Sequence, residues 1–229
     1  MLLSCAMSLD GYIDDASDAR LVLSGPEDLD EVDELRAGSD AILVGAGTIR
    51  RDEPRLLIRS PARRQARIAR GAPPDPLRIV LTATGDLDPG AQIFTSDGGA
   101  RVVYAASRAA GDLTKRLGDL ADVVEAGDRL DLTAVLADLV DRGVERLLVE
   151  GGSTVHTSFL TAGVADELRL SVAPFFIGDS AAPRFVGDVD YRWRPGAPAE
   201  LIEARRVGSQ VVLTYALSDR LMRRPRRQR

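Results

Sequence analysis

Cysteine, lysine and histidine are almost missing from this chain of 229 residues, which has one of each: Cys5, Lys115 and His156. A single cysteine excludes an internal disulfide and a zinc site built from the cysteines of one chain. A Schiff-base mechanism would have to use Lys115, which lies in a helix-like segment where nothing indicates a binding pocket. A Ser-His-Asp arrangement would have to use His156. Because no Gly-x-Ser-x-Gly is present, we predict a capping or surface histidine instead.

Metal-binding and membrane-spanning patterns are also missing. The sequence has no EF-hand spacing and neither His-x-Glu nor Pro-Cys-x-x-Cys, so no metal site is predicted. No apolar run approaches the roughly 18 residues of a membrane span. The first residues, MLLSCAMSLDGY, become polar too early for a secretory signal. We therefore expect a cytoplasmic protein that does not bind a membrane.

Acidic and basic residues are unevenly distributed. The formal net charge is −5, but the last ten residues, RLMRRPRRQR, contain six arginines, which leaves −11 on residues 1–219. We expect a single domain over residues 1–219 and a disordered basic tail at 220–229. Since the tail has no aromatic residues that could stack on bases, we expect no nucleic-acid partner.

Short aliphatic runs alternate with helical patterns along most of the chain. The runs are typical of buried strands and lie at 2–8, 40–45, 77–83, 101–106, 121–126 and 146–150. Among the helical patterns between them, Ser24 and Glu27 predict a capping box, and another helix is expected between Asp131 and Gly143. This alternation predicts an α/β fold with a mostly parallel central sheet covered by helices.

The end of the sequence changes character. The segment 166–178 alternates between apolar and polar residues, and two further apolar runs are joined by Gly208 and Ser209, a pair that suits a tight hairpin. We therefore expect C-terminal antiparallel strands on one side of the parallel sheet. The run VVLTYAL at 211–217 is predicted to form an apolar edge that suits a two-fold homodimer.

Two of the predicted strands end in glycines where a helix begins. VGAGTIRRD at 44–52 is no dinucleotide fingerprint, because Arg50 stands where the third glycine would be, but EGGST at 150–154 repeats its strand-glycine-helix design. Glycines leave backbone N–H groups open to a ligand, and helix N-termini favour anions. Because parallel strands end at one edge, we expect the two turns to bracket one extended cofactor. The alternative is that these glycines serve packing alone.

An arginine-rich segment follows the first glycine turn. RRDEPRLLIR at 50–59 has four arginines around Asp52 and Glu53, and guanidinium groups match a phosphate with two hydrogen bonds each. A substrate phosphate is one interpretation of this segment. A solvated charged loop is the other.

Together these segments resemble the reductase domain of riboflavin biosynthesis, the C-terminal half of the bifunctional deaminase-reductase. The resemblance implies a dihydrofolate-reductase-like, three-layer α/β/α fold over about residues 1–217. It is carried by AMSLDG at 6–11, LRAGSDAILVGAGT at 35–48, DEPRL at 52–56, LLVEGG at 147–152 and FLTAGVADEL at 159–168. The chain departs from the pattern at Ser4, where many members have lysine, and in VLSG at 22–25, where many have a tryptophan.

The resemblance implies an NADPH-dependent oxidoreductase that reduces 5-amino-6-(5-phosphoribosylamino)uracil to its ribitylamino product by hydride transfer to the sugar C1′. By matching position, the cofactor-binding residues would be Ala6, Gly45, Thr48, Glu150, Gly151, Gly152, Ser153 and Thr154. The substrate-binding residues would be Ser8, Arg36, Asp52, Leu56 and Arg59. Of these, Arg36 and Arg59 would bind the phosphate, and Asp52 would be catalytic, orienting the sugar hydroxyls or relaying a proton. A separate deaminase is expected for the preceding step.

Two other functions stay open. The same fold and cofactor could reduce dihydrofolate or another pterin or aminopyrimidine, with an acidic residue of the early helix as proton donor. The candidates on that helix are Asp28, Asp30, Glu31, Asp33 and Glu34. A non-enzymatic binding protein that uses the arginine-rich tail is the third possibility, although it would need no glycine turns.

Overall fold

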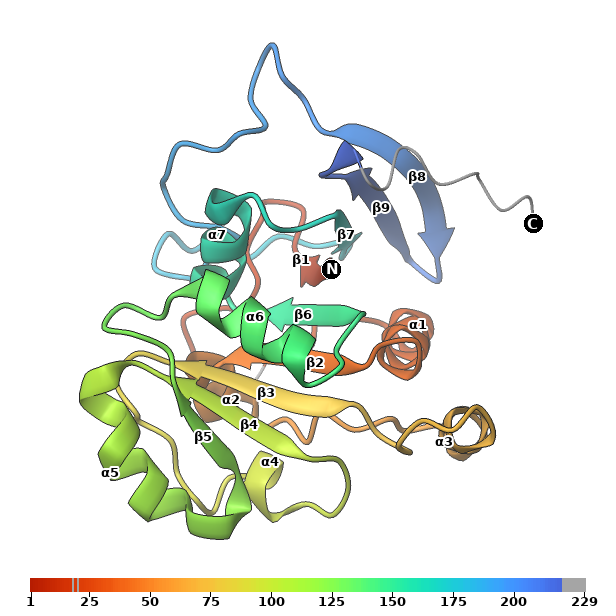
Figure 1. Ribbon diagram of the computed structural model, residues 1–229. Helices are drawn as coiled ribbons and strands as arrows, with labels where there is room; N and C mark the ends of the chain where they lie inside the picture. Colours follow the sequence, from red (N-terminus) through yellow and green to blue (C-terminus); the bar gives the residue numbers. More distant parts are fainter. Residues whose placement is uncertain (18, 20, 220–229) are drawn as a thin grey trace.

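The computed structural model describes residues 1–17, 19 and 21–219, and these residues contain one nine-stranded sheet of order β5-β4-β3-β2-β6-β1-β7-β9-β8 (Figure 1). The strands are β1 (Leu2–Met7), β2 (Ala41–Gly45), β3 (Leu77–Thr82), β4 (Arg101–Ala105), β5 (Asp122–Glu125), β6 (Leu147–Gly151), β7 (Glu167–Val172), β8 (Glu200–Val207) and β9 (Gln210–Ala216). Strands β1 to β7 pair in parallel, whereas β9 is antiparallel to both β7 and β8. The predicted parallel sheet with late antiparallel strands is confirmed.

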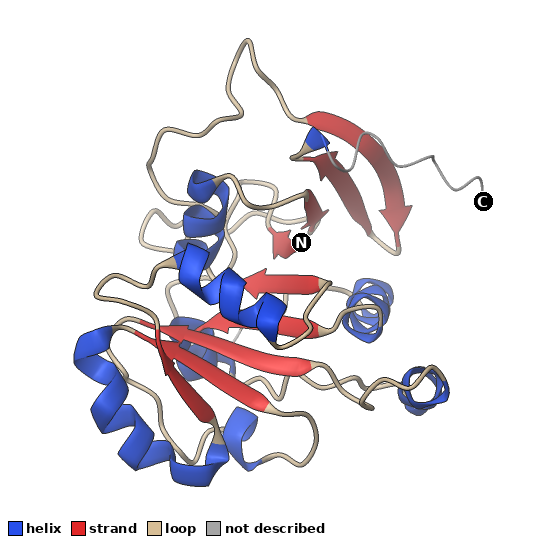
Figure 2. Cartoon of the chain, in the orientation of Figure 1, coloured by secondary structure: helices blue, strands red, loops and turns tan. Residues whose placement is uncertain are grey.

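Helices cover both faces of this sheet (Figure 2). They are α1 (Pro26–Ala37), α2 (Ala46–Asp52), α3 (Pro61–Ala69), α4 (Gln92–Thr95), α5 (Ser107–Leu117), α6 (Leu132–Asp141) and α7 (Ser153–Ala162), with a 3-10 turn, η1 (Gly118–Leu120). Because side chains alternate along a strand, the sheet contributes to two apolar clusters. One contains residues of α6 and α7, and the other contains residues of α2, α4 and α5, which gives the predicted three layers.

The ends of several elements follow from local sequence. Helix α6 begins after Asp131, whose carboxylate accepts a hydrogen bond from the Thr133 backbone N–H at 2.8 Å. The β8–β9 hairpin turns at Gly208, which has a φ of 56° as a tight turn requires. The predicted capping box at Ser24 is wrong, because α1 has Gly25 at its N-cap and starts at Pro26, whose fixed φ suits a first helical position.

The strand expected at the apolar sheet edge lies inside the sheet. VVLTYAL falls largely in β9, which is paired on both sides, and β8 is the edge strand at that end. The sequence shows the hairpin but not which of its two strands pairs with β7. The predicted basic tail at 220–229 lies outside the described residues. Within the described part of the chain, every helix is too short or too polar to cross a membrane.

The order of the central strands decides where the functional motifs meet. Strand β6 lies between β2 and β1, so three strands that are far apart in sequence end side by side. Val44 of β2 is paired with Gly151 of β6, which places the two glycine turns next to each other. Ala6 lies near the end of β1 on the same edge.

Candidate active site

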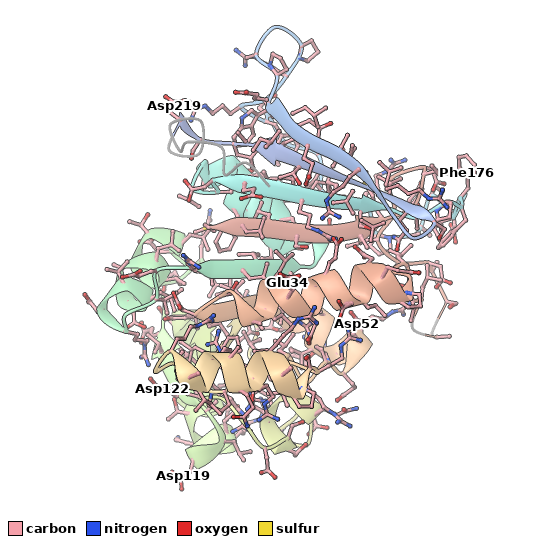
Figure 3. The ribbon with its side chains drawn as sticks, turned by 90° about the vertical axis from the view of Figure 1, so that its right-hand side faces the viewer. Glu34, Asp52, Asp119, Asp122, Phe176 and Asp219 are labelled. Atoms are coloured by element: carbon pink, nitrogen blue, oxygen red, sulfur yellow. The ribbon has the colours of Figure 1, made fainter. Side chains whose placement is uncertain are left out.

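Two cavities open at this edge of the sheet and share part of their walls. The inner cavity has a volume of about 220 Å³ and is lined from β1, α1, β6 and β7, and the outer cavity has about 390 Å³ and is lined from α2 and the start of α7. The residues that line both are Ile13, Leu21, Thr48, Asp52 and Gly152. The cavities are therefore contiguous, and together they form one elongated site. Figure 3 shows Asp52 beside α1, on the other side of the molecule from Asp122 and Asp219.

The two glycine turns are packed directly against each other. The Thr48 hydroxyl accepts a hydrogen bond from the Gly152 backbone N–H at 3.2 Å, which joins the first turn of α2 to the start of α7. A Cβ on Gly45 would lie 2.9 Å from Val155 Cγ2, and one on Gly152 would lie 3.3 Å from Thr48 Oγ1. This confirms the predicted convergence of the turns, and close packing is one reason for glycine at both positions.

Gly47 is different, because it faces open space. It lines the outer cavity, and no described protein atom outside its own helix backbone and its chain neighbours lies within 4 Å of the position that its Cβ would take. Ser153 and Thr154 line the same cavity in the first turn of α7, where backbone N–H groups have no partner within the helix. The helix dipole adds partial positive charge there. These are the properties that an anionic, extended ligand needs.

Ionic side chains dominate the inner cavity. Arg36 Nε and Nη2 donate to the two carboxylate oxygens of Glu150 at 2.7 and 2.6 Å, and Arg36 Nη1 donates to the Leu57 carbonyl oxygen at 3.3 Å. Burial lowers the pKa of Arg36, but the ion pair with Glu150 outweighs it and the pKa is raised. Arg36 and Glu150 thus line the inner cavity as an ion pair whose charges largely cancel.

A second ionic group closes the inner end of this cavity. Arg169 Nη2 donates to Asp28 Oδ1 at 2.6 Å and to Glu31 Oε2 at 2.9 Å, and both Arg169 and Asp28 are almost fully buried. Ser4 lies beside them, because it is paired with Arg169 across β1 and β7. The motifs do not include Arg169, and its signal in the sequence is a charged residue in the middle of an apolar strand.

Most of the predicted site residues line one or both cavities. The inner cavity is lined by Ala6, Arg36, Thr48, Asp52, Glu150 and Gly152, and the outer cavity by Gly45, Thr48, Asp52, Gly152, Ser153 and Thr154. Of these, Asp52 lies where the cavities join. Their contacts with ligands stay predictions.

Four predicted residues do not line either cavity. The Ser8 hydroxyl is fully buried, donates to Asp10 and accepts from the Tyr12 backbone N–H, so it stabilises a turn. Leu56 is buried in the core on the α2 side with a φ of 54°. Arg59 is 55% exposed and lies in a neighbouring hollow with Asp30 and Asp33.

The fourth is Gly151, which lies beneath the site. Its φ is 119°, and a Cβ there would lie 2.8 Å from His156 Nε2. Gly151 therefore permits the close approach of α7 to the end of β6. This explains a glycine without any direct contact with a ligand.

The single histidine is neither a cap nor a surface residue. His156 lines the inner cavity from the second turn of α7, is fully buried, and packs on Phe185 with ring centroids 5.2 Å apart. Neither ring nitrogen has a hydrogen-bond partner among the described residues. Burial lowers the pKa of His156 to about 4, so the ring is neutral at physiological pH. The surface prediction was wrong because α7 turns this residue toward the sheet.

The side chains of the site limit the chemistry that the protein itself can do. Within the described ranges, no group of three or more histidine, cysteine, aspartate or glutamate residues is placed to hold a metal ion. The site combines backbone amides with paired arginines and carboxylates. Such an arrangement can orient two organic ligands and move a proton, but any hydride has to come from a bound cofactor.

Known proteins resemble this chain in sequence. Residues 1–213 match the family described as the RibD C-terminal domain. A protein of Archaeoglobus fulgidus named 2,5-diamino-6-ribosylamino-4(3H)-pyrimidinone 5′-phosphate reductase is 40% identical over 185 residues, which are 80% of this chain and 84% of that protein.

Two solved structures show the same fold. A pyrimidine reductase-like protein of Corynebacterium diphtheriae has a TM-score of 0.80 at 21% identity, with 94% of this chain and 90% of that one covered. A Thermotoga maritima protein titled diaminohydroxyphosphoribosylaminopyrimidine deaminase/5-amino-6-(5-phosphoribosylamino)uracil reductase has a TM-score of 0.75 at 23% identity, and this chain covers 55% of it. The chain therefore belongs to the RibD C-terminal domain family, which confirms the resemblance drawn from its motifs.

Proposed function

We propose that this chain is an NADPH-dependent reductase of riboflavin biosynthesis that converts 2,5-diamino-6-ribosylamino-4(3H)-pyrimidinone 5′-phosphate to its ribitylamino product. The observation that carries the proposal is the pair of contiguous cavities, one lined by glycine turns and the other by ionic side chains. The name of the Archaeoglobus fulgidus relative supports the diamino base. The resemblance had suggested the related aminouracil, which differs at position 2 of the ring.

The outer cavity fits a dinucleotide. Gly47 and Gly152 leave space and backbone where side chains would intrude, and Ser153 and Thr154 add hydroxyl groups at a helix N-terminus. We place the diphosphate of NADPH here, with Gly45 and Thr48 beneath it. The cofactor supplies a hydride when bound, and Ala6 lies in the adjoining cavity, in reach of the nicotinamide end. The choice of NADPH over NADH is part of the proposal.

The protein's own groups position the reactants and hold protons. Arg36 fixes the Glu150 carboxylate through two hydrogen bonds, so its oxygens keep one orientation at the cavity wall. Asp52 lines both cavities, and we propose that it orients the sugar hydroxyls or relays a proton where the two ligands meet. Deamination of the pyrimidine would then be left to a separate deaminase.

The phosphate end of the substrate is assigned to Arg36 in preference to Arg59. Arg36 lines the inner cavity, which adjoins the proposed cofactor site, whereas Arg59 lies outside that cavity in a hollow with Asp30 and Asp33. The Arg59 guanidinium also donates to the Leu29 carbonyl oxygen. Arg59 is therefore the weaker candidate of the two predicted phosphate-binding residues.

One assay tests the activity. Purified protein is mixed with NADPH and one candidate substrate at a time, and NADPH oxidation is followed by absorbance. The three substrates are the ribosylamino-diaminopyrimidinone phosphate, the ribosylamino-aminouracil phosphate and dihydrofolate. We expect turnover of a ribosylamino phosphate, with the ribitylamino product identified by mass spectrometry. Turnover of dihydrofolate alone would replace the proposal with the pterin reductase alternative, and turnover of none would leave a binding protein.

A two-fold dimer is also proposed, on the face of the β8–β9 hairpin. Leu201, Ile202 and Val211 are 49%, 40% and 45% exposed there, so the hairpin leaves large apolar side chains uncovered. Gel filtration with light scattering measures the mass. A monomer at micromolar concentration would contradict this assignment.

A further inference from the structure

A buried carboxylate oxygen at the inner end of the site has no partner. Asp28 is 1% exposed, and its Oδ1 accepts a hydrogen bond from Arg169, but its Oδ2 has no hydrogen-bond partner within the part of the chain that the structure describes. A buried carboxylate normally fills its acceptor positions, because an unpaired one is costly. Asp28 also lines the inner cavity. The unpaired acceptor therefore belongs to a residue of the cavity wall.

This wall is assembled from three elements. Asp28, Val32 and Arg36 are four residues apart on α1, so they follow one side of the helix, and all three line the inner cavity. Ser4 and Ala6 lie on the same face of β1 and also line the cavity, and Arg169 reaches it from the neighbouring strand β7. The wall at Asp28 thus presents one acceptor oxygen beside one guanidinium group.

The position of the wall identifies which part of the substrate meets it. The outer cavity takes the cofactor in our proposal, and the two cavities join at Thr48, Asp52 and Gly152, so the sugar carbon that accepts hydride lies near that junction. Asp28 does not line the outer cavity. The sugar is attached to C6 of the pyrimidine, and the ring edge farthest from C6 is N3 with its neighbours C2 and C4. That edge points toward Asp28 and Arg169.

The hydrogen-bonding pattern of that edge matches the wall for one of the two candidate bases. The 2-amino-4(3H)-pyrimidinone presents two donors, the 2-amino group and N3–H, followed by the O4 acceptor. The uracil presents an acceptor at position 2 instead. A carboxylate only accepts hydrogen bonds, whereas a guanidinium only donates them. In the diamino base, the 2-amino group therefore donates to Asp28 and O4 accepts from Arg169. In the uracil, the O2 acceptor would face the acceptor oxygen of Asp28.

We propose that Asp28 is the residue that selects the base: its free oxygen accepts a hydrogen bond from the 2-amino group and excludes the 2-oxo analogue. This inference rests on the proposed function and adds the group by which the substrate is recognised. Arg169 acts as a positioning residue, since its ion pair with Asp28 holds the carboxylate in place. A site that leaves a buried acceptor unpaired, or faces it with another acceptor, discriminates by a factor of about 100 or more.

The test compares the two ribosylamino phosphates on wild type, Asp28→Asn and Glu31→Gln at saturating NADPH. We expect wild type to favour the diamino base in kcat/KM by about 100-fold or more. Asp28→Asn replaces an acceptor with an amide that can donate to O2, so the ratio should fall by about 100-fold. Glu31→Gln is the matched control, because Glu31 is the other carboxylate bound to Arg169 but does not line the cavity. Its ratio should stay within about threefold of wild type.

The outcomes separate the two proposals. If wild type reduces neither compound, the proposed function fails. If wild type reduces both equally well, or Asp28→Asn keeps the wild-type ratio, the base-selecting role is overturned while the reductase function stands. Should Asp28→Asn fail to fold, calorimetry of the 2-amino and 2-oxo ribitylamino products on wild type decides, because equal affinities would overturn the role of Asp28. NADPH affinity is measured for each variant and should be unchanged.

Discussion

The two ends of the elongated site are built in different ways. The outer end contains the two glycine turns, which are short continuous segments at the ends of strands, 45–48 and 152–154, and the loop 13–16 completes its wall. The inner end uses the side chains of Ser4, Asp28 and Arg169, and Asp28 and Arg169 are 141 positions apart in the chain. In the proposed function, local motifs thus hold the cofactor, while groups that only the strand order brings together recognise the substrate. Predictions that damage one end and spare the other test this division.

The largest effect is expected at the outer end, from Gly151→Val. Gly151 has a left-handed φ of 119°, and a Cβ would lie 2.8 Å from His156 Nε2. Backbone strain and overpacking together should lower the free energy of unfolding by about 3 kcal/mol or more. The start of α7 would shift with it, so NADPH binding should be lost. Chemical denaturation and fluorescence titration with NADPH measure the two effects.

Gly47→Ala is the matched control for that substitution. No neighbouring atom of the described residues lies within 4 Å of its Cβ position, so the free energy of unfolding should stay within about 0.5 kcal/mol of wild type. The added methyl group projects from the wall of the outer cavity and should weaken NADPH about tenfold. Unchanged NADPH affinity in Gly47→Ala would show that this cavity does not hold the cofactor. A stable Gly151→Val would contradict the packing role of Gly151.

The difference between the ends also explains what the sequence could predict. The glycine turns, the hairpin at Gly208 and the helix after Asp131 depend on residues that are adjacent in the chain, and these predictions are confirmed. The pairing of β7 with β1 decides that Arg169 lies beside Ser4, and no local pattern encodes that pairing. Asp28 could be named only as one of five acids on its helix, because the side of α1 that faces the cavity depends on tertiary packing.

Most of the residues that the resemblance named line the two cavities, but the resemblance could not show which partners each side chain has. Ser8 matches a motif position, yet its hydroxyl is hydrogen-bonded to Asp10 and to the Tyr12 backbone N–H within a turn. Arg36 and Arg59 had been given the same role, yet one is paired with Glu150 inside the cavity and the other is half exposed outside it. Such partners follow from the packing of distant segments. They are available only from the structure.

A second prediction concerns the inner end and compares these two arginines. Arg36→Ala leaves the Glu150 carboxylate unpaired at the wall of the inner cavity and removes the proposed phosphate contact. Loss of one partner of a buried, hydrogen-bonded charge pair costs at least about 2 kcal/mol, so kcat/KM for the ribosylamino phosphate should fall about 30-fold or more. Arg59→Ala should lower it less than about threefold. NADPH affinity should be nearly unchanged in both variants.

Steady-state kinetics on the two variants give a clear ranking. Equal losses of kcat/KM in Arg36→Ala and Arg59→Ala would support the prediction that both arginines bind the phosphate. A loss in Arg59→Ala alone would move the phosphate to the hollow between α1 and the segment that follows Leu56. Either result would shift the inner end of the site away from the cavity that Arg36 lines.

The smallest effect tests His156, which packs next to Gly151 and lines the inner cavity. Its pKa is about 4 in the folded protein, below the ordinary value of 6.5, because burial disfavours the charged ring. As the pH falls, the unfolded chain therefore binds a proton before the folded protein does, so the stability contributed by the neutral ring is complete above about pH 7 and is lost between about pH 6.5 and 4. Between pH 8 and pH 5, wild type should lose about 2 kcal/mol through this group alone.

Comparison with His156→Gln isolates that contribution, because glutamine does not titrate and all other groups stay the same. Denaturant unfolding of both proteins at pH 8 and pH 5 should give a loss that is about 2 kcal/mol larger for wild type. Identical pH dependence would mean that the ring is hydrated or hydrogen-bonded in the folded protein. In that case His156 would have to face the ligands, and the support beneath the glycine turns would itself become part of the site.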